Sequence, residues 1–234
     1  EDLSGNGVED ISFELHRGEI LGFGGLVGAG RTEIMRVLSG VDARTGGRAW
    51  LDGKELSMKS PRISIREGIA LIPEDRKRQG VVLSLPILEN VILPNLKLVT
   101  KYSVINRRKE GALVSEQMKA LRIAAPSMRQ LAGNLSGGNQ QKVVLAKWLL
   151  SRSRVLIFDE PTRGIDVGAK QEIYKLMCAL CEQGASIIMI SSEMEELLGM
   201  SDRIVVLCEG RQEGILKRED FSQEAVLALA SGNQ

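Results

Sequence analysis

The stretch GLVGAGRT, from Gly25 to Thr32, follows the short apolar run EILGFGG and leads into the helix-like segment RTEIMRVLSG. Its glycines allow successive backbone N–H groups to turn inward toward phosphate oxygens, and the start of the following helix adds positive potential. A tight strand-to-helix turn without a ligand would have the same composition. Arg31 stands where phosphate-cradling loops normally carry lysine; it keeps the positive charge, but its guanidinium is bulkier than an ammonium group.

The rest of the chain alternates apolar runs with helix-like segments. Four further β-branched runs predict interior strands of a sheet covered on both faces: GIALIPED, VLIFDEP, SIIMISSE and DRIVVLCEG. The Asp-Gly pair at 52–53 predicts a β-hairpin. Across residues 84–152 helix-like segments dominate, and only the first residues, ILENVIL, have strand character. We therefore predict an α/β core with a β subdomain, residues 1–83 and 153–234, into which 84–152 is inserted as a helical subdomain.

Composition excludes several classes of function. The chain has 234 residues, 43% of them hydrophobic, and 31 Lys+Arg against 30 Asp+Glu give a formal net charge of +1. This balance provides no electrostatic footprint for nucleic acid and no polybasic segment for a membrane surface. No apolar run is long enough to span a bilayer, and the amino terminus EDLSGNGVED does not resemble a signal peptide. Because no initiating Met is present, we expect the chain to be a piece of a longer polypeptide.

The three cysteines are too few for a disulfide framework, which fits a reducing cytosol. Cys178 and Cys181 form a C-x-x-C pair within a helix-like segment, where a redox or zinc site is the alternative to a core position. The only histidine, His16, lies far away in the sequence. We favour the core, because a stripe of residues recurs at helical spacing: Ile173, Leu176, Met177, Leu180 and Cys181.

Two acidic residues end the apolar run VLIFDEP. Asp159 is placed to hold a magnesium ion through water, Glu160 to orient or deprotonate an attacking water, and the Thr32 hydroxyl to bind the same ion. Alone, the pair would be an ordinary acidic strand end. Together with the glycine loop it predicts a site for a nucleoside triphosphate.

A third motif, LSGGNQQK, spans Leu135 to Lys142, about twenty residues before the acidic strand. Ser136 is a natural N-cap, and two glycines leave the first backbone N–H groups of a helix exposed to an anion. The motif resembles the signature of ATP-binding cassette (ABC) proteins, and the resemblance covers essentially the whole chain. In that family two cassettes pack head to tail, with each ATP between the glycine loop of one and the signature of the other.

The resemblance implies a P-loop NTPase (RecA-like) α/β core with an antiparallel β subdomain, an inserted helical subdomain, and ATP and Mg²⁺ as ligands. It implies Glu160 and Ser192 as catalytic residues, Ser192 occupying the position of the family's switch histidine in ISSEM. Implied magnesium ligands are Thr32, Asp159 and Glu74, the last at the family's glutamine position in IPEDR. Implied nucleotide contacts are Gly25, Gly28, Ala29, Gly30, Arg31, Thr32, Glu33, Ser136, Gly137, Gly138 and Asn139, with Asp166 in PTRGID at the cassette interface.

Several positions depart from the general family pattern. Arg31 replaces lysine, Glu33 a second hydroxyl, Glu74 glutamine and Ser192 histidine, and no aromatic residue for adenine stacking occurs in the first dozen positions. These same departures resemble the second cassette of the tandem ATPases that power bacterial importers of ribose, galactose, arabinose, xylose and related solutes. The resemblance therefore implies a preceding cassette in the same polypeptide, membrane-spanning permease subunits, an indirect sugar-binding protein partner, and a peripheral location on the cytoplasmic face of the inner membrane.

Three functional hypotheses remain from the sequence. The first is an importer ATPase domain with a slow site, whose signature completes the faster site of a partner cassette. The second is a regulatory nucleotide-binding domain that never hydrolyses, against which Glu160 argues. The third is a cassette acting on nucleic acid or ribosomes, against which the near-zero net charge argues. For the isolated chain we expect a mainly monomeric domain with weak Mg-ATP binding and very little hydrolysis.

Overall fold

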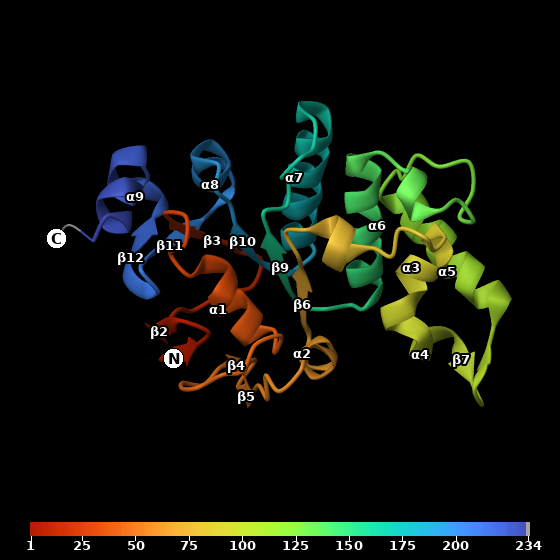
Figure 1. The fold of residues 1–234 in the computed structure, drawn as a ribbon, viewed down its shortest axis with the longest axis horizontal. Helices are drawn as coiled ribbons and strands as arrows, with labels where there is room; N and C mark the ends of the chain where they lie inside the picture. Colours follow the sequence, from red (N-terminus) through yellow and green to blue (C-terminus); the bar gives the residue numbers. More distant parts are fainter. Residues whose placement is uncertain (233–234) are drawn as a thin grey trace. The chain divides into compact units, whose positions relative to one another are not determined.

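The computed structural model describes residues 1–232 (Figure 1). Their contacts divide the chain into two compact units. The sheet unit comprises residues 1–71, 153–161 and 173–232, and the helical unit comprises Ile72–Arg152 and Thr162–Glu172.

A six-stranded sheet dominates the sheet unit, in the order β12-β11-β3-β10-β9-β6. The strands are β3 (Ile20–Gly25), β6 (Ile69–Ile72), β9 (Val155–Asp159), β10 (Ser186–Ile190), β11 (Arg203–Cys208) and β12 (Arg211–Lys217). The predicted strands are confirmed, but the prediction that all are interior is wrong for β6, which lies at the edge of the sheet. The other edge, β12, was not predicted, because its sequence RQEGILK mixes charged and apolar residues and is only partly buried.

Strands β3, β10 and β9 run parallel, and they are paired up to the carboxyl end of β10. Ile190 of β10 pairs with Asp159 of β9 on one side and with Phe23 of β3 on the other. Every residue of β9 and β10 is buried. The carboxyl ends of β3, β9 and β10 therefore meet at one edge of the sheet, the usual location for ligands in parallel α/β folds.

Three two-residue turns in the sheet unit have positive φ at both positions, which is the geometry of type I′ hairpins. Asn6-Gly7 (φ 49° and 82°) joins β1 (Leu3–Gly5) to β2 (Val8–Ile11). Glu209-Gly210 (46° and 81°) joins β11 to β12. Asp52-Gly53 (51° and 75°) joins the antiparallel strands β4 (Trp50–Leu51) and β5 (Lys54–Glu55), which confirms the predicted hairpin.

Helices pack around this sheet. They are α1 (Arg31–Leu38), α2 (Pro61–Glu67), α8 (Met194–Met200), α9 (Gln223–Ala230) and the 3₁₀ turn η4 (Arg218–Asp220), with α7 (Val167–Glu182) continuing from the helical unit. α1 buries Ile34, Met35 and Val37 completely, and α8 and α9 pack on β3. Burying each large aliphatic side chain contributes about 1.5 to 3 kcal/mol, so these contacts fix α1 relative to the end of β3.

The predicted apolar stripe of α7 is confirmed in part. Ile173 and Met177 are buried, Cys181 is half-buried, and burial raises the pKa of the Cys181 thiol to about 12. Cys178 is exposed, so the core interpretation is wrong for this member of the pair. Within residues 1–232, no three His, Cys, Asp or Glu side chains are arranged to hold a metal ion.

The helical unit is built around α6 (Gly137–Leu150), which contacts α3 (Ile87–Ile92) and α5 (Arg107–Ala120). Its smaller elements are the π-helical turn η1 (Arg76–Gly80), the 3₁₀ turns η2 (Leu93–Asn95) and η3 (Ala132–Asn134), the short helix α4 (Leu96–Val99), and the hairpin β7 (Thr100–Lys101) and β8 (Val104–Ile105). The β7–β8 hairpin was not predicted.

The segment ILENVIL forms helix α3, so its predicted strand character is wrong. Asn90 is buried and explains the difference. Its side chain accepts a hydrogen bond from the Val82 N–H at 2.7 Å. It also donates to the carbonyl oxygens of Val82, Leu85 and Pro86. These bonds pin the start of α3 to the preceding loop, and a strand could not satisfy them.

Candidate functional site

The phosphate loop, residues 25–32, connects β3 to α1 with glycines in the positive-φ region. The φ angles of Gly25, Gly28 and Gly30 are 149°, 83° and 96°. A Cβ atom at Gly25 would lie 2.5 Å from the Leu207 carbonyl oxygen, whereas one at Gly28 would meet nothing within 4 Å. The middle of the loop is therefore open on its outer side, while its two ends are packed closely against the protein.

Helix α1 begins directly after this loop. Its N-cap, Gly30, offers no side-chain hydrogen bond to the first turn, and Glu33 is the acidic residue there. Ala29 is buried, while Val27 is 95% exposed. A helix start without a side-chain cap leaves N–H groups available to an anion, so this geometry can hold a phosphate group.

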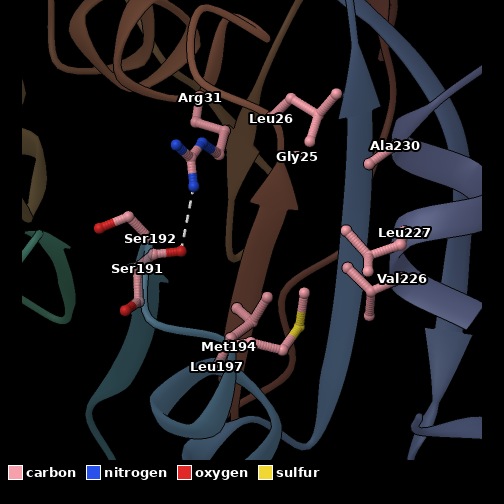
Figure 2. A pocket seen from close by; sticks show the side chains of 10 residues that line it. All are labelled: Gly25, Leu26, Arg31, Ser191, Ser192, Met194, Leu197, Val226, Leu227 and Ala230. Atoms are coloured by element: carbon pink, nitrogen blue, oxygen red, sulfur yellow. Dashed lines mark hydrogen bonds between the residues drawn. The ribbon is translucent and has the colours of Figure 1, made fainter. Parts of the chain in front are cut away.

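Arg31 points away from the loop toward the end of β10 (Figure 2). Its Nη1 donates a hydrogen bond to the Ser191 carbonyl oxygen at 3.0 Å. Nothing in the sequence singled out Ser191 as this partner. Arg31 is the only positively charged residue of the loop, and one of its hydrogen-bond donors is already bonded within the chain.

Thr32 and Asp159 lie together where α1 begins and β9 ends. The Thr32 Oγ1 donates to Asp159 Oδ1 at 3.1 Å. Asp159 is only 3% exposed, and burial raises the pKa of its carboxyl group to about 6, with partial compensation by the Thr32 hydrogen bond. A hydroxyl beside a buried carboxylate supplies the hard oxygen donors that Mg²⁺ prefers, with waters completing its coordination.

Glu160 and Ser192 form a second pair at the same edge of the sheet. The Ser192 Oγ donates to Glu160 Oε2 at 3.0 Å, and the Glu160 N–H donates to the Ile190 carbonyl oxygen at 3.0 Å. Glu160 has φ of 49°, a left-handed conformation that is uncommon outside glycine. Strained backbone of this kind clusters at functional sites, which supports a role for Glu160.

A small cavity of about 30 Å³ lies beside the phosphate loop and Arg31 (Figure 2). Its remaining wall is largely apolar and comes from Leu26, Met194, Leu197, Val226, Leu227 and Ala230. The volume suits one or two water molecules. It is therefore too small for a nucleobase.

The remaining predicted site residues lie in the helical unit. Ser136 caps α6 by accepting a hydrogen bond from the Asn139 N–H, and Asn139 Oδ1 accepts one from the Ala124 N–H at 2.8 Å. A Cβ atom at Gly137 would lie 2.6 Å from Arg76 Nη2, and one at Gly138 would lie 3.0 Å from Ala169 Cβ. The contact at Gly137 is with the far end of a flexible side chain, which can move aside, whereas a Cβ atom at Gly138 requires Ala169 to shift by a few tenths of an ångström.

Arg76 contacts several groups around this helix start, although no role was predicted for it beyond its place in PEDR. It donates to the Arg163 carbonyl oxygen at 2.8 Å and to the Gly164 carbonyl oxygen at 3.1 Å. Glu74 pairs with the Arg163 side chain. Asp166 is exposed and accepts a hydrogen bond from the Ala169 N–H at 3.0 Å, at the first turn of α7.

The predicted site residues thus fall into two groups. The sheet unit brings together the phosphate loop, Glu33, Asp159, Glu160 and Ser192. The helical unit brings together Glu74, residues 136–139 and Asp166. A glycine loop, a second glycine-rich helix start and an acidic strand end follow one another in this order along the chain. All three lie within residues 8–163, which match a family model described as ABC transporter. The chain belongs to the ABC transporter family.

Curated relatives support this membership over nearly the whole chain. The chain is 49% identical over 226 residues to a ribose import ATP-binding protein of Bacillus cereus, covering 97% of this chain and 46% of that protein. It is 51% identical over 233 residues to a putative ribose/galactose/methyl galactoside import ATP-binding protein of Rhizobium etli, covering 99% and 44%. The chain therefore spans about half the length of the curated relatives it matches.

Solved structures confirm the predicted fold class. The ADP conformation of MJ1267, an ATP-binding cassette of an ABC transporter, superimposes with a TM-score of 0.80 at 18% identity, covering 99% of this chain and 96% of that one. The described part of this chain contains no helix with the length and apolar character needed to cross a bilayer.

Proposed function

We propose that this chain is a nucleotide-binding domain of an ATP-driven sugar importer, that it binds Mg-ATP, and that its own site hydrolyses slowly. The identity to relatives named for ribose and galactoside import supports the substrate class. The observation that carries the proposal is the convergence of two hydrogen-bonded pairs, Thr32–Asp159 and Ser192–Glu160, beside the phosphate loop.

Each pair has a part in this function. The phosphate loop and the start of α1 hold the triphosphate through backbone N–H groups. Thr32 and Asp159 hold Mg²⁺, which neutralises phosphate charge when it is bound. Glu160 orients an attacking water or accepts its proton, and the Ser192 hydroxyl fixes the direction of that carboxylate.

Two features support slow chemistry at this site. Arg31 donates to the Ser191 carbonyl oxygen, so its charge is directed toward the end of β10. Ser192 holds a hydroxyl where the family has a histidine, and a positioned general acid or base contributes on the order of 10² to 10⁴ in rate.

The proposal extends to partners. In a head-to-tail pair, the start of α6 with residues 136–139 completes the site of a preceding cassette in the same polypeptide, and Asp166 lies at the cassette interface. Glu74, in addition to its pairing with Arg163, becomes a ligand of Mg²⁺ in that assembly. The exposed residues near Lys77 contact a membrane-spanning permease subunit, which places the domain at the cytoplasmic face of the bacterial membrane. A sugar-binding protein acts indirectly through the permease.

Calorimetry and a phosphate-release assay on this chain test the proposal. We expect weak but measurable Mg-ATP binding, a mainly monomeric chain on size exclusion, and phosphate release that barely exceeds that of Glu160→Gln. Absence of binding at millimolar Mg-ATP would contradict the nucleotide site. Rapid turnover that Glu160→Gln abolishes would contradict the slow site.

A non-hydrolysing regulatory domain makes a different prediction in the paired assembly. There, single-turnover hydrolysis at this site separates the two functions. Phosphate released in one round, and lost in Glu160→Gln, supports the importer ATPase; no release at all supports the regulatory role.

A further inference from the structure

Two hairpin turns pack against each other and against the phosphate loop. These paired turns, Asn6-Gly7 and Glu209-Gly210, come from opposite ends of the chain. The Gly210 N–H donates to the Ala29 carbonyl oxygen at 3.1 Å, and the Gly210 carbonyl oxygen accepts from the Glu9 N–H at 2.9 Å. Gly210 is therefore bonded to the phosphate loop on one side and to β2 on the other.

The packing at this junction leaves no room for additional atoms. A Cβ atom at Gly210 would overlap the Gly7 carbonyl oxygen. A Cβ atom at Gly30 would lie 2.5 Å from Val8 Cγ1 and 3.2 Å from Gly210 Cα. Val8 and Ala29 are 2% and 4% exposed. A side chain introduced at Gly210 must therefore displace the backbone at Gly7 and Val8 or move Gly210 itself, and a move of Gly210 is passed to the phosphate loop through its hydrogen bond to Ala29.

Further contacts fasten the two hairpins together beyond the turns. The Arg211 guanidinium pairs with the Glu9 carboxylate at 2.7 Å, and Gln212 Oε1 accepts from the Ser12 N–H at 3.0 Å. The exposed ion pair is worth little by itself. Together with the backbone bonds of Gly210, it holds β2 against β12.

We propose that Gly210 is a positioning residue for nucleotide binding: the Glu209-Gly210 turn fixes Ala29 and Gly30 so that the loop's N–H groups face a phosphate. Gly210 acts through the loop and does not touch the ligand. The inference rests on the proposed function, because it gives this turn a part in the same nucleotide site. A shift of the loop by a fraction of an ångström lowers affinity, since the hydrogen bonds to phosphate depend on direction.

The chain contains a matched control for this proposal. Gly53 occupies the equivalent position of another type I′ turn, with φ of 75° against 81° at Gly210, but its Cβ would meet nothing within 4 Å. Gly53→Ala and Gly210→Ala therefore introduce similar backbone strain, and only the latter adds an overlap. Asn tolerates left-handed φ better than Ala, so Gly210→Asn relieves strain and keeps the overlap.

Three quantities are measured for each variant: Mg-ATP affinity by calorimetry, the unfolding midpoint, and amide hydrogen exchange at residues 26–30 without nucleotide. We expect Gly210→Ala and Gly210→Asn each to weaken affinity about tenfold and to speed this exchange. Gly210→Asn recovers part of the unfolding midpoint without recovering affinity. Gly53→Ala lowers the midpoint but binds Mg-ATP as the wild-type chain does.

Several outcomes would overturn the proposal. Wild-type affinity and exchange in Gly210→Ala would do so, as would recovery of affinity together with stability in Gly210→Asn. If the Gly210 variants do not fold, Val8→Ala, which removes atoms that pack beside Gly30, must produce the same two changes. If the wild-type chain binds no Mg-ATP, the proposed function fails, and exchange at residues 26–30 decides alone whether the turn holds the loop.

Discussion

Arg31 donates to the Ser191 carbonyl oxygen, and this bond determines what a substitution at position 31 does. Lysine carries a compact ammonium on a flexible stem that can follow the loop toward a phosphate. We expect Arg31→Lys to bind Mg-ATP about tenfold more tightly than the wild-type chain, which calorimetry measures. Arg31→Met removes the charge and serves as the control, with weaker binding than wild type. Equal affinities of the Lys and Met variants would contradict this interpretation.

Asp159 makes stability depend on pH, because burial raises the pKa of its carboxyl group from 3.8 to about 6. The folded state binds this proton more strongly than the unfolded state, so the contribution to stability is present below about pH 4 and is lost as pH rises to about 6. The loss is about 2 to 3 kcal/mol.

Urea unfolding in magnesium-free buffer tests this, with Asp159→Asn as the reference that cannot titrate. We expect the stability of Asp159→Asn relative to wild type to increase by about 2 to 3 kcal/mol between pH 4 and pH 7. A difference that does not change with pH would show that the carboxyl group is not buried as described.

Helix α3 depends on one buried amide. Asn90 makes hydrogen bonds to the Val82 N–H and to three carbonyl oxygens. Asn90→Ala removes the acceptor of the Val82 N–H and one of two hydrogen bonds to each carbonyl oxygen, which keep their backbone donors. We therefore expect a loss of about 1 to 3 kcal/mol in the free energy of unfolding. Asn134→Ala, at an exposed position, is the control and should stay within about 0.5 kcal/mol of wild type in urea unfolding. Equal losses of unfolding free energy in both variants would show that the Asn90 side chain does not stabilise α3.

Two substitutions of Gly137, the first residue of α6, distinguish the effect of an added negative charge from the effect of an added side chain. Gly137→Ala and Gly137→Asp both place a Cβ atom against Arg76, and only Asp adds a negative charge where an anion is proposed to bind. In the assembly of two cassettes, we expect Gly137→Asp to lower turnover at the partner's site about tenfold or more relative to Gly137→Ala. If steady-state ATPase assays give the two variants the same rate, this helix start does not serve the partner's site.

Sequence and structure agree best where a strand has a strong apolar signal, as in β9 and β10, and where a turn has its own chemistry, as at Asp52-Gly53. They disagree at ILENVIL, because a short apolar β-branched run fits a strand or a buried helix equally well. The contacts of Asn90 with the preceding loop decide between them, and composition does not contain this information.

In the candidate site, motifs predict which residues take part, but they do not predict which residues these side chains contact. Arg31 and Ser191 are separated by 160 positions in the chain, and the two members of the paired turns lie still farther apart in sequence. No local pattern specifies such contacts. The roles assigned to the site residues remain predictions.

The segment after β6 provides a prediction for the assembled transporter. Lys77 and Gln79 are exposed, in a charged loop that includes Glu74 and Arg76. We expect a cysteine at either position, in a Cys178→Ser background that removes the exposed native thiol, to crosslink to the permease subunit in membranes. Crosslinks confined to other copies of this polypeptide would contradict the proposed contact.

The place of β3 between β10 and β11 has a consequence for how the chain folds during synthesis (Figure 1). β3 ends at Gly25, and the strands that pair with it begin only at Ser186 and Arg203. At about 5 to 20 residues per second, a ribosome needs roughly 8 to 30 s to produce the first of these neighbours. During that interval the apolar strand that leads into the phosphate loop has neither edge paired. The sheet around β3 therefore forms late, after β10 and β11 have been synthesised, and in the meantime β3 is a natural binding segment for a chaperone.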